Sequence, residues 1–352
     1  MQHHLTYGDI EAATDRISGR VLPVAIAPVD AGAIPTAHRD PLDDRPDAAC
    51  EVWLALEYMQ HTGSFKARGA QNFIQAHRDA GTLPDHGVTI ASGGNAGLAC
   101  AWAAQQQGIS ATVFLPTTAP EVKVAKLRGY GADVRLVGTE YAEALAACED
   151  FAKATGALPS HAYDHPLIAA GAGTLLEEIR ARVPGLDTVV VAVGGGGLFA
   201  GIATAAQHHG IRTVAVEPEN CRALNAALQA GRPVDVPVDS IASDSLGARR
   251  TSAMALHSAQ QDRVHSVLVG DDEIVRARQS LWDHQRIAVE HGAATALAAL
   301  IAAPHHVPDR DLTTRPKGSS RNYRPANGER VAVVLCGANT DPSGLVQRAT
   351  GL

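Results

Sequence analysis

The sequence has few of the features that mark secreted, membrane-spanning or disulfide-bonded proteins. Its 352 residues include five cysteines, without a CxxC pair or the even count of a disulfide framework. No run of 18 or more apolar residues occurs, so we expect no membrane-spanning helix. The first residues lack the basic-then-apolar pattern of a secretory signal. Together these absences favour a reduced, cytoplasmic protein with no membrane partner.

Basic charge and metal-binding motifs are also scarce. The formal net charge is −7 and no long basic run is present, which gives no electrostatic case for a nucleic-acid partner. The chain has 16 histidines, yet they form neither an HExxH motif nor a Cys/His cluster. We therefore predict no metal site from the histidines.

Short β-branched runs alternate with alanine-rich stretches along most of the chain. The predicted strands are 88–94, 111–116, 133–138, 188–195, 212–217, 265–270 and 330–337. The predicted helices are 95–107, 120–129, 140–155, 171–183, 197–209, 221–230, 272–288 and 293–303. Near-continuous apolar strands alternating with helices indicate parallel sheets covered on both faces, so the predicted class is α/β.

Two segments interrupt this rhythm. Residues 28–50 and 304–329 are rich in proline, aspartate and arginine, which predicts two long loops. Loops of this length are uncommon in compact domains and are usually functional or mobile. The sequence assigns neither of them a role.

A run of glycines follows the strongest strand candidate. The segment GGGGL comes directly after TVVVAV and opens an apolar helix. Glycines let backbone N–H groups turn inward, and a helix N-terminus favours negative charge, so the segment suits a phosphate. The alternative is a tight strand-to-helix turn without a ligand. The candidate phosphate-binding residues are Gly194, Gly195, Gly196, Gly197 and Leu198.

A second polar turn, SGGNAG at 92–97, lies at another strand-to-helix junction. Ser92 can donate a hydrogen bond, Gly94 exposes its backbone N–H, and Asn95 both donates and accepts. A carboxylate needs several such donors at the start of a helix. The alternative is a plain N-cap, although one capping residue would be enough for that role.

Lys66 and Cys336 are two further candidate site residues because of their positions in the sequence. Lys66 lies in HTGSFKARGA, and by itself it would be interpreted as a solvated surface charge. Cys336 ends the strand candidate VAVVLC, where a cysteine is most often a small apolar filler. In parallel sheets, however, ligands bind beyond the carboxyl ends of strands. Both residues could therefore converge with the two glycine-containing turns.

Seven motifs occur in the order seen in one enzyme family: TGSFKARGA, SGGNAG, GAGTLLEEI, GGGGLFAGI, VEPEN, VEHGAA and VLCGAN. The chain resembles pyridoxal-phosphate enzymes of the tryptophan-synthase β-like fold, and within them the serine/threonine dehydratase (threonine deaminase) family. The resemblance covers about residues 5–345. It implies a large cofactor-binding domain made of 1–85 and 165–352, and a small mobile domain at 86–164.

The resemblance implies a cofactor, pyridoxal 5'-phosphate, and a role for each matching residue. Lys66 matches the lysine that binds the cofactor covalently, and Phe65 the residue that flanks its ring. Asn95 matches the asparagine that bonds the ring hydroxyl. The glycine run 194–198 matches the phosphate loop, and Cys336 the position that faces the pyridine nitrogen.

The resemblance also implies a substrate site and a reaction. Ser92, Gly94 and Asn95 match the turn that holds the substrate carboxylate, and the freed amine of Lys66 would remove the Cα proton. The expected reaction converts a 3-hydroxy amino acid, L-threonine or L-serine, to a 2-oxo acid and ammonia in a homodimeric enzyme. A neutral thiol at Cys336 would favour prompt elimination over transamination.

The sequence departs from related enzymes at two places. Serine racemases of this family carry a serine where this chain has Gly93, so efficient racemisation is not expected. Their cation site combines a glutamate, here Glu217, with an aspartate where this chain has Ala223. A tight metal site is therefore not expected, and a looser site at Glu217 stays open. Two alternatives remain, a dehydratase for a substrate such as 3-hydroxyaspartate and a non-catalytic amino-acid-binding relative.

Overall fold

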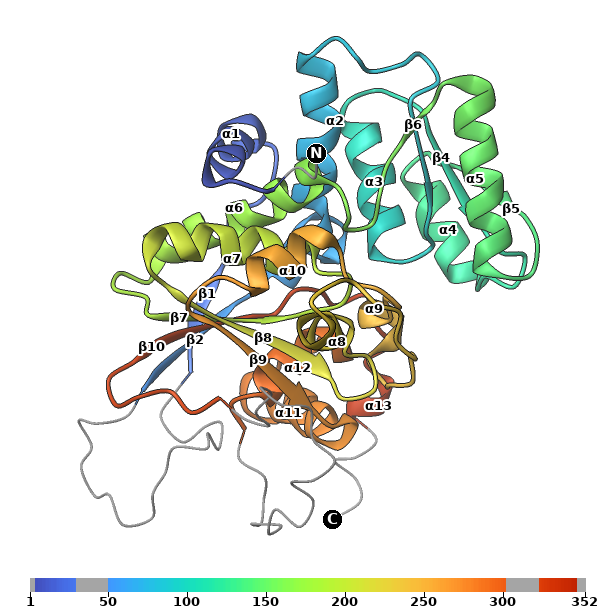
Figure 1. Ribbon diagram of the computed structural model, residues 1–352. Helices are drawn as coiled ribbons and strands as arrows, with labels where there is room; N and C mark the ends of the chain where they lie inside the picture. The colour runs from blue at the N-terminus through green and yellow to red at the C-terminus, as the bar shows by residue number, and fades with distance from the viewer. Residues whose placement is uncertain (1–3, 30–49, 302–322, 347–352) are drawn as a thin grey trace.

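We analysed a computed structural model, which describes residues 4–29, 50–301 and 323–346. The two predicted loops, 28–50 and 304–329, lie largely outside the described residues. The described chain forms two lobes, each built on its own sheet (Figure 1). Among the described helices, none is long and apolar enough to cross a lipid bilayer.

The larger lobe is built on a six-stranded sheet with the order β1-β2-β10-β7-β8-β9. Only β1 is antiparallel to its neighbour. Helices α6, α7 and α10 lie on one face and α11 and α12 on the other (Figure 1), so the central strands are buried on both sides. The strands are β1 (Ile26–Pro28), β2 (Glu51–Ala55), β7 (Thr188–Ala192), β8 (Arg212–Pro218), β9 (Val264–Val269) and β10 (Arg330–Val334).

Long and short helices both belong to this lobe. Glycine or a polar residue ends many of them, as expected where a chain must turn. The helices are α1 (Tyr7–Ile17), α6 (Pro166–Arg182), α7 (Gly197–His209), α8 (Ala223–Ala230), α9 (Ser243–Leu246), α10 (Ala253–Ala259), α11 (Asp271–Gln285), α12 (His291–Ala298) and α13 (Ser343–Val346).

The smaller lobe is built on a parallel four-stranded sheet with the order β5-β4-β3-β6. Helix α5 packs on one face of this sheet, while α2, α3 and α4 pack on the other. Its elements are β3 (Val88–Ala91), β4 (Ala111–Leu115), β5 (Asp133–Leu136), β6 (Leu158–Pro159), α3 (Asn95–Gln106), α4 (Glu121–Gly129) and α5 (Tyr141–Thr155). Helix α2 (Lys66–Asp79) contacts both α3 and α6, so it joins the two lobes (Figure 1).

The predicted α/β class is confirmed, and the predicted strands and helices are present with shifted ends, although the last two residues of the predicted helix 293–303 lie outside the described residues. The sequence analysis missed α1, α2, α9, α10, α13, β1, β2 and β6 as regular elements. Helix α2 was missed because polar side chains interrupt its buried apolar surface. Arg68 is fully buried and pairs with Glu57 at 2.5 Å and Glu178 at 2.6 Å. Paired polar groups can fill a core position, but they hide the apolar pattern that signals a buried helix.

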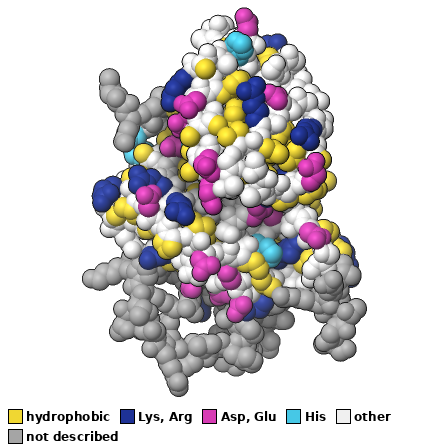
Figure 2. Space-filling view, turned by 90° about the vertical axis from the view of Figure 1, so that its right-hand side faces the viewer, with side chains coloured by type: hydrophobic (Ala, Val, Ile, Leu, Met, Phe, Trp, Pro, Cys, Tyr) yellow, Lys and Arg dark blue, Asp and Glu magenta, His cyan; other side chains and the backbone are white. Residues whose placement is uncertain are grey.

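Acidic and basic side chains are interspersed over both lobes on the face shown in Figure 2. Neither sign forms a continuous field on that face. Apolar side chains lie between them in small groups. This distribution is typical of a protein whose surface does not steer a large charged polymer.

Candidate active site

Lys66 is the first residue of α2, and the chain before it is attached to the end of β10. Ser64 forms a β-bridge with Gly337, and the Phe65 N–H donates to the Cys336 carbonyl oxygen at 3.0 Å. These backbone contacts fix Lys66 next to Cys336. The sequence analysis allowed Lys66 to converge with Cys336, and the structure brings the two residues together.

The amine of Lys66 lies deep in the site, although the residue as a whole is partly exposed. Its Nζ donates a hydrogen bond to the Ala162 carbonyl oxygen at 2.7 Å and lies 4.9 Å from the centroid of the Phe65 ring. Removal from solvent disfavours the charged form and lowers the pKa of Lys66 to about 8, although Cys336 and Glu290 oppose this shift. A lysine with such a pKa carries a usable fraction of neutral, nucleophilic amine near neutral pH.

The glycine run connects β7 to α7 and passes under Tyr163. A Cβ at Gly195 would lie 2.4 Å from the Tyr163 ring, and one at Gly197 would lie 2.8 Å from the Tyr163 carbonyl oxygen. Gly196, the N-cap of α7, has a φ of 97°, which side chains with a Cβ rarely adopt. Glycine is therefore required by the shape of this turn and by its close neighbour.

The N–H groups of residues 194–198 donate hydrogen bonds to no other described residue. The loop carbonyl at Gly195 is held by the Ser252 N–H at 3.0 Å, which keeps the turn in place. Free N–H groups at a helix start are suited to an anion. Because Tyr163 follows Ala162, one short segment places both the Lys66 amine and this loop at the same site.

The SGGN turn connects β3 to α3 in the smaller lobe. The Gly94 N–H approaches Ser92 Oγ at 3.4 Å, and Asn95 is the first residue of α3. A Cβ at Gly97 would lie 1.8 Å from the Ser92 carbonyl oxygen, so glycine is needed to close the turn. Ser92, Gly94 and Asn95 are all partly exposed, which leaves the turn accessible to a small ligand.

The Asn95 side chain is held by two residues that the sequence analysis did not select. Its Nδ2 donates to Glu290 at 3.1 Å (Oε1) and 3.2 Å (Oε2). Its Oδ1 accepts from Asn339 Nδ2 at 2.8 Å, and that nitrogen also donates to the Thr62 carbonyl oxygen at 2.7 Å. Glu290 and Asn339 lie in the VEHGAA and VLCGAN motifs, so the signal that could have found them was already present.

The thiol of Cys336 is buried, with 4% of the residue exposed. Burial raises the pKa of Cys336 strongly, and the nearby carboxyl of Glu290 raises it further. The thiol therefore stays neutral at physiological pH. A neutral thiol at the end of β10 is a weak hydrogen-bonding group rather than a charged one.

Glu217 lies at the end of β8, and its two oxygens already have partners. They accept the N–H groups of Leu224 at 2.7 Å and Asn225 at 2.8 Å, at the start of α8. Burial raises the pKa of Glu217 to about 8, while those two hydrogen bonds lower it. No group of three or more metal-ligating side chains occurs among the described residues. In this arrangement Glu217 acts as a helix cap.

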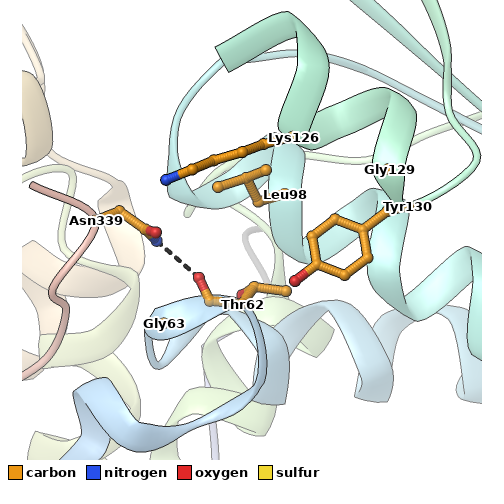
Figure 3. A pocket seen from close by; sticks show the side chains of 7 residues that line it. All are labelled: Thr62, Gly63, Leu98, Lys126, Gly129, Tyr130 and Asn339. Carbon is orange, nitrogen blue, oxygen red and sulfur yellow. Dashed lines mark hydrogen bonds between the residues drawn. The ribbon is translucent and has the colours of Figure 1, made fainter. Parts of the chain in front are cut away.

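A cavity of about 400 Å³ lies between the lobes, next to the SGGN turn. In Figure 3, Lys126 from α4 extends toward Asn339, and the Tyr130 hydroxyl lies near Thr62. Asn339 therefore contacts both this cavity and Asn95. The residues that line the cavity are Thr62, Gly63, Leu98, Lys126, Gly129, Tyr130 and Asn339.

Comparison with known proteins identifies the family. A family model described as "Pyridoxal-phosphate dependent enzyme" matches residues 32–314. A human protein named serine dehydratase-like is 36% identical over 297 residues, covering 83% of this chain and 86% of that protein. An L-threonine ammonia-lyase from Geobacter sulfurreducens is 36% identical, covering 71% of this chain and 62% of the relative. The solved structure of maize serine racemase has a TM-score of 0.80 and 26% identity, covering 99% and 97% of the two chains.

The chain therefore belongs to the pyridoxal-phosphate-dependent enzymes, and its fold is the two-lobed tryptophan-synthase β-like fold. The resemblance that the motifs implied is confirmed, and pyridoxal phosphate is the cofactor. The site fits this group. Free N–H groups at 194–198 suit the phosphate, the enclosed amine of Lys66 suits a covalent bond to an aldehyde, and Cys336 offers a neutral partner for a ring nitrogen.

Proposed function

We propose that the protein is an ammonia-lyase that converts a 3-hydroxy amino acid, L-threonine or L-serine, to a 2-oxo acid and ammonia. One observation carries this proposal: the enclosed Lys66 amine, with a pKa near 8, lies beside Cys336 and beneath the segment that covers the glycine run. The names of the human and Geobacter relatives, a serine dehydratase-like protein and an L-threonine ammonia-lyase, support the same reaction.

Lys66 has two roles in this proposal. Its amine would hold the cofactor covalently, and the same amine, when free, would accept the proton from the substrate Cα. When bound, pyridoxal phosphate supplies the electron sink that makes loss of this proton feasible. The lowered pKa suits the second role, because a base works best when its pKa lies near the operating pH.

The remaining cofactor contacts follow from the free donors of the site. The N–H groups at 194–198 would hold the phosphate, and Phe65 would flank the ring. Asn95 would donate to the ring hydroxyl. Cys336 would offer the ring nitrogen a neutral thiol, which would not hold a proton there as a carboxylate does. This arrangement favours elimination over transamination.

The SGGN turn holds the substrate. Ser92 Oγ and the N–H groups of Gly94 and Asn95 bind its carboxylate, which places the Cα–H bond toward Lys66. Loss of that proton and of the β-hydroxyl as water gives an enamino acid. Water then adds to the released enamino acid and ammonia leaves, so the net products are one 2-oxo acid and one ammonium ion.

The proposal also covers the domains of the enzyme, its assembly and its location. We propose that residues 86–164 form a small domain that moves against the rest, 1–85 and 165–352, as substrate enters. The enzyme works as a homodimer in the cytoplasm. Gly93 offers no acid or base on the second face of the substrate, so deamination should exceed racemisation.

A substrate panel tests the proposal. The purified protein is incubated with L-threonine, L-serine and 3-hydroxyaspartate, and release of 2-oxo acid and of ammonia is measured for each. We expect release from threonine or serine and none from the Lys66→Ala variant. Deamination that persists in Lys66→Ala would refute the role of this lysine. A wild-type protein that binds the cofactor but deaminates no hydroxy amino acid would favour the non-catalytic alternative.

A further inference from the structure

Glu290 is a buried acid that the proposed reaction does not use, and it lies among three residues that do. It is 8% exposed and is the N-cap of α12. We propose that Glu290 is a positioning residue for the cofactor: it accepts one N–H of the Asn95 amide and so directs the other N–H toward the cofactor's ring hydroxyl. This inference deepens the proposed function, and it rests on it for the location of the ring.

The orientation of the Asn95 amide follows from its neighbours. The Thr62 carbonyl oxygen can only accept, so the Asn339 atom that contacts it must be the amide nitrogen. The same nitrogen contacts Asn95, whose atom at that position must be the acceptor, Oδ1. The Asn95 nitrogen therefore faces Glu290, and an amide flip would break both ends of this chain.

The position of the Glu290 carboxyl is fixed by the fold rather than by a ligand. The Glu290 N–H donates to the Gly337 carbonyl oxygen at 3.1 Å, which attaches the start of α12 to the extension of β10. A Cβ at Gly337 would lie 2.5 Å from Glu290 Oε1, so only glycine leaves room for the carboxyl. Asn95 lies in the smaller lobe, so its two contacts with the Glu290 carboxyl connect the two lobes at the site.

An amide nitrogen carries two hydrogens, and Glu290 accounts for one. Glu290 is the only acceptor for Asn95 Nδ2 among the described residues. Both contacts of this nitrogen go to one carboxylate, so in this proposal the second hydrogen is left for a ligand. Asp244 on α9, Lys66 on α2 and Cys336 after β10 are the charged or titratable groups that face Glu290. None of these three donates to or accepts from the Asn95 side chain.

The readout is the visible absorbance of the bound cofactor, followed against pH in the holoenzyme without substrate. A donor to the ring hydroxyl stabilises its ionised form, so loss of an ordered donor raises the pH at which the absorbance changes. For one hydrogen bond we expect an upward shift of about one pH unit and a cofactor Kd raised roughly tenfold in Glu290→Ala. Asn95→Ala should give the same shift.

A double-mutant cycle separates positioning from a merely structural role. If Glu290 acts through Asn95, the Glu290→Ala/Asn95→Ala protein should show the shift and the Kd of Asn95→Ala alone. Additive effects, or a Glu290→Ala spectrum identical to wild type, would overturn the proposal. Glu290→Gln keeps one acceptor oxygen, so its pH midpoint and cofactor Kd should return most of the way to the wild-type values. If Glu290→Ala does not fold, Glu290→Leu, which fills the space without an acceptor, replaces it as the test variant and should show the same shift.

Asp244→Asn is the matched control, because it removes a negative charge facing Glu290 without removing a contact of Asn95. The midpoint of its absorbance change should stay within about 0.3 pH unit of the wild-type midpoint, and its cofactor Kd should stay within about twofold of the wild-type value. A shift as large as that of Glu290→Ala would assign the effect to charge and overturn the hydrogen-bond explanation. These spectra require no turnover, so failure of the wild type to deaminate threonine or serine would be seen separately in 2-oxo acid release.

Discussion

The enclosed Lys66 amine should make the cofactor-free protein less stable, and replacing Lys66 with methionine should relieve this cost. Methionine keeps an unbranched side chain of similar length but carries no charge to desolvate. In the folded protein the pKa of Lys66 lies at about 8, below its ordinary value of 10.5. Between these values the unfolded chain binds one proton more than the folded chain. Stability should therefore rise with pH across this window.

The magnitude follows from the gap between the two pKa values. At about 1.4 kcal/mol per pH unit, Lys66 lowers the free energy of unfolding by about 3 kcal/mol at pH 7. At pH 9.5 the folded amine is already neutral, and only about one pH unit separates this pH from the pKa of the unfolded lysine, so the cost falls to about 1.4 kcal/mol. The stabilisation of Lys66→Met relative to wild type should thus shrink by about 2 kcal/mol between the two conditions.

Urea unfolding of both cofactor-free proteins at pH 7 and pH 9.5 measures this difference. The lost hydrogen bond to the Ala162 carbonyl and any change in packing contribute at both pH values and largely cancel in the comparison. Lys66→Leu, a second uncharged variant, should give the same pH-dependent part despite its different shape. A difference that stays constant from pH 7 to 9.5 in both variants would refute the burial of a costly amine.

Two further substitutions test the turns around the site. Gly195→Ala places a methyl group 2.4 Å from the Tyr163 ring, so we expect a loss of about 1–3 kcal/mol in stability and weaker cofactor binding by titration; unchanged binding would mean that the loop relaxes freely. Gly93→Ser should add an acid/base group, but its Cβ would lie 2.7 Å from Leu115 Cδ2. We therefore expect L-to-D serine conversion, measured by chiral chromatography, to increase most when Leu115→Val is also present. Rapid conversion by the wild type would contradict the role given to Gly93.

Most of the strands and of the longer helices could be predicted because their composition is simple. β7 reads TVVVA and is buried throughout, so a continuous apolar run identified it without any knowledge of its neighbours. The sequence also allowed Lys66 to converge with Cys336 and the other strand-end segments. The role given to each residue of the site stays a prediction, since position alone does not establish contact with a ligand.

The parts that were missed depend on partners far away in the sequence. Arg68 occupies a core position because Glu57 and Glu178 neutralise it, and no local pattern reveals such a pairing. The same holds for Glu290, which meets Asn95 across 195 residues of chain. Hydrophobic periodicity reports on burial of apolar groups, so it cannot detect a buried polar group that tertiary contacts satisfy.

The site contains several polar groups that have no partner in the described part of the chain, and these groups lower the stability of the folded chain. The N–H groups at 194–198 lack acceptors among the described residues, and the hydroxyls of Thr62 and Ser64 are buried without a partner there. Each such group costs free energy, and the Lys66 amine adds to the cost. A ligand that brings an anion and consumes the amine removes several of these costs at once. Binding of pyridoxal phosphate should therefore stabilise the fold beyond the contacts it adds, because it satisfies groups that the folded chain leaves unsatisfied.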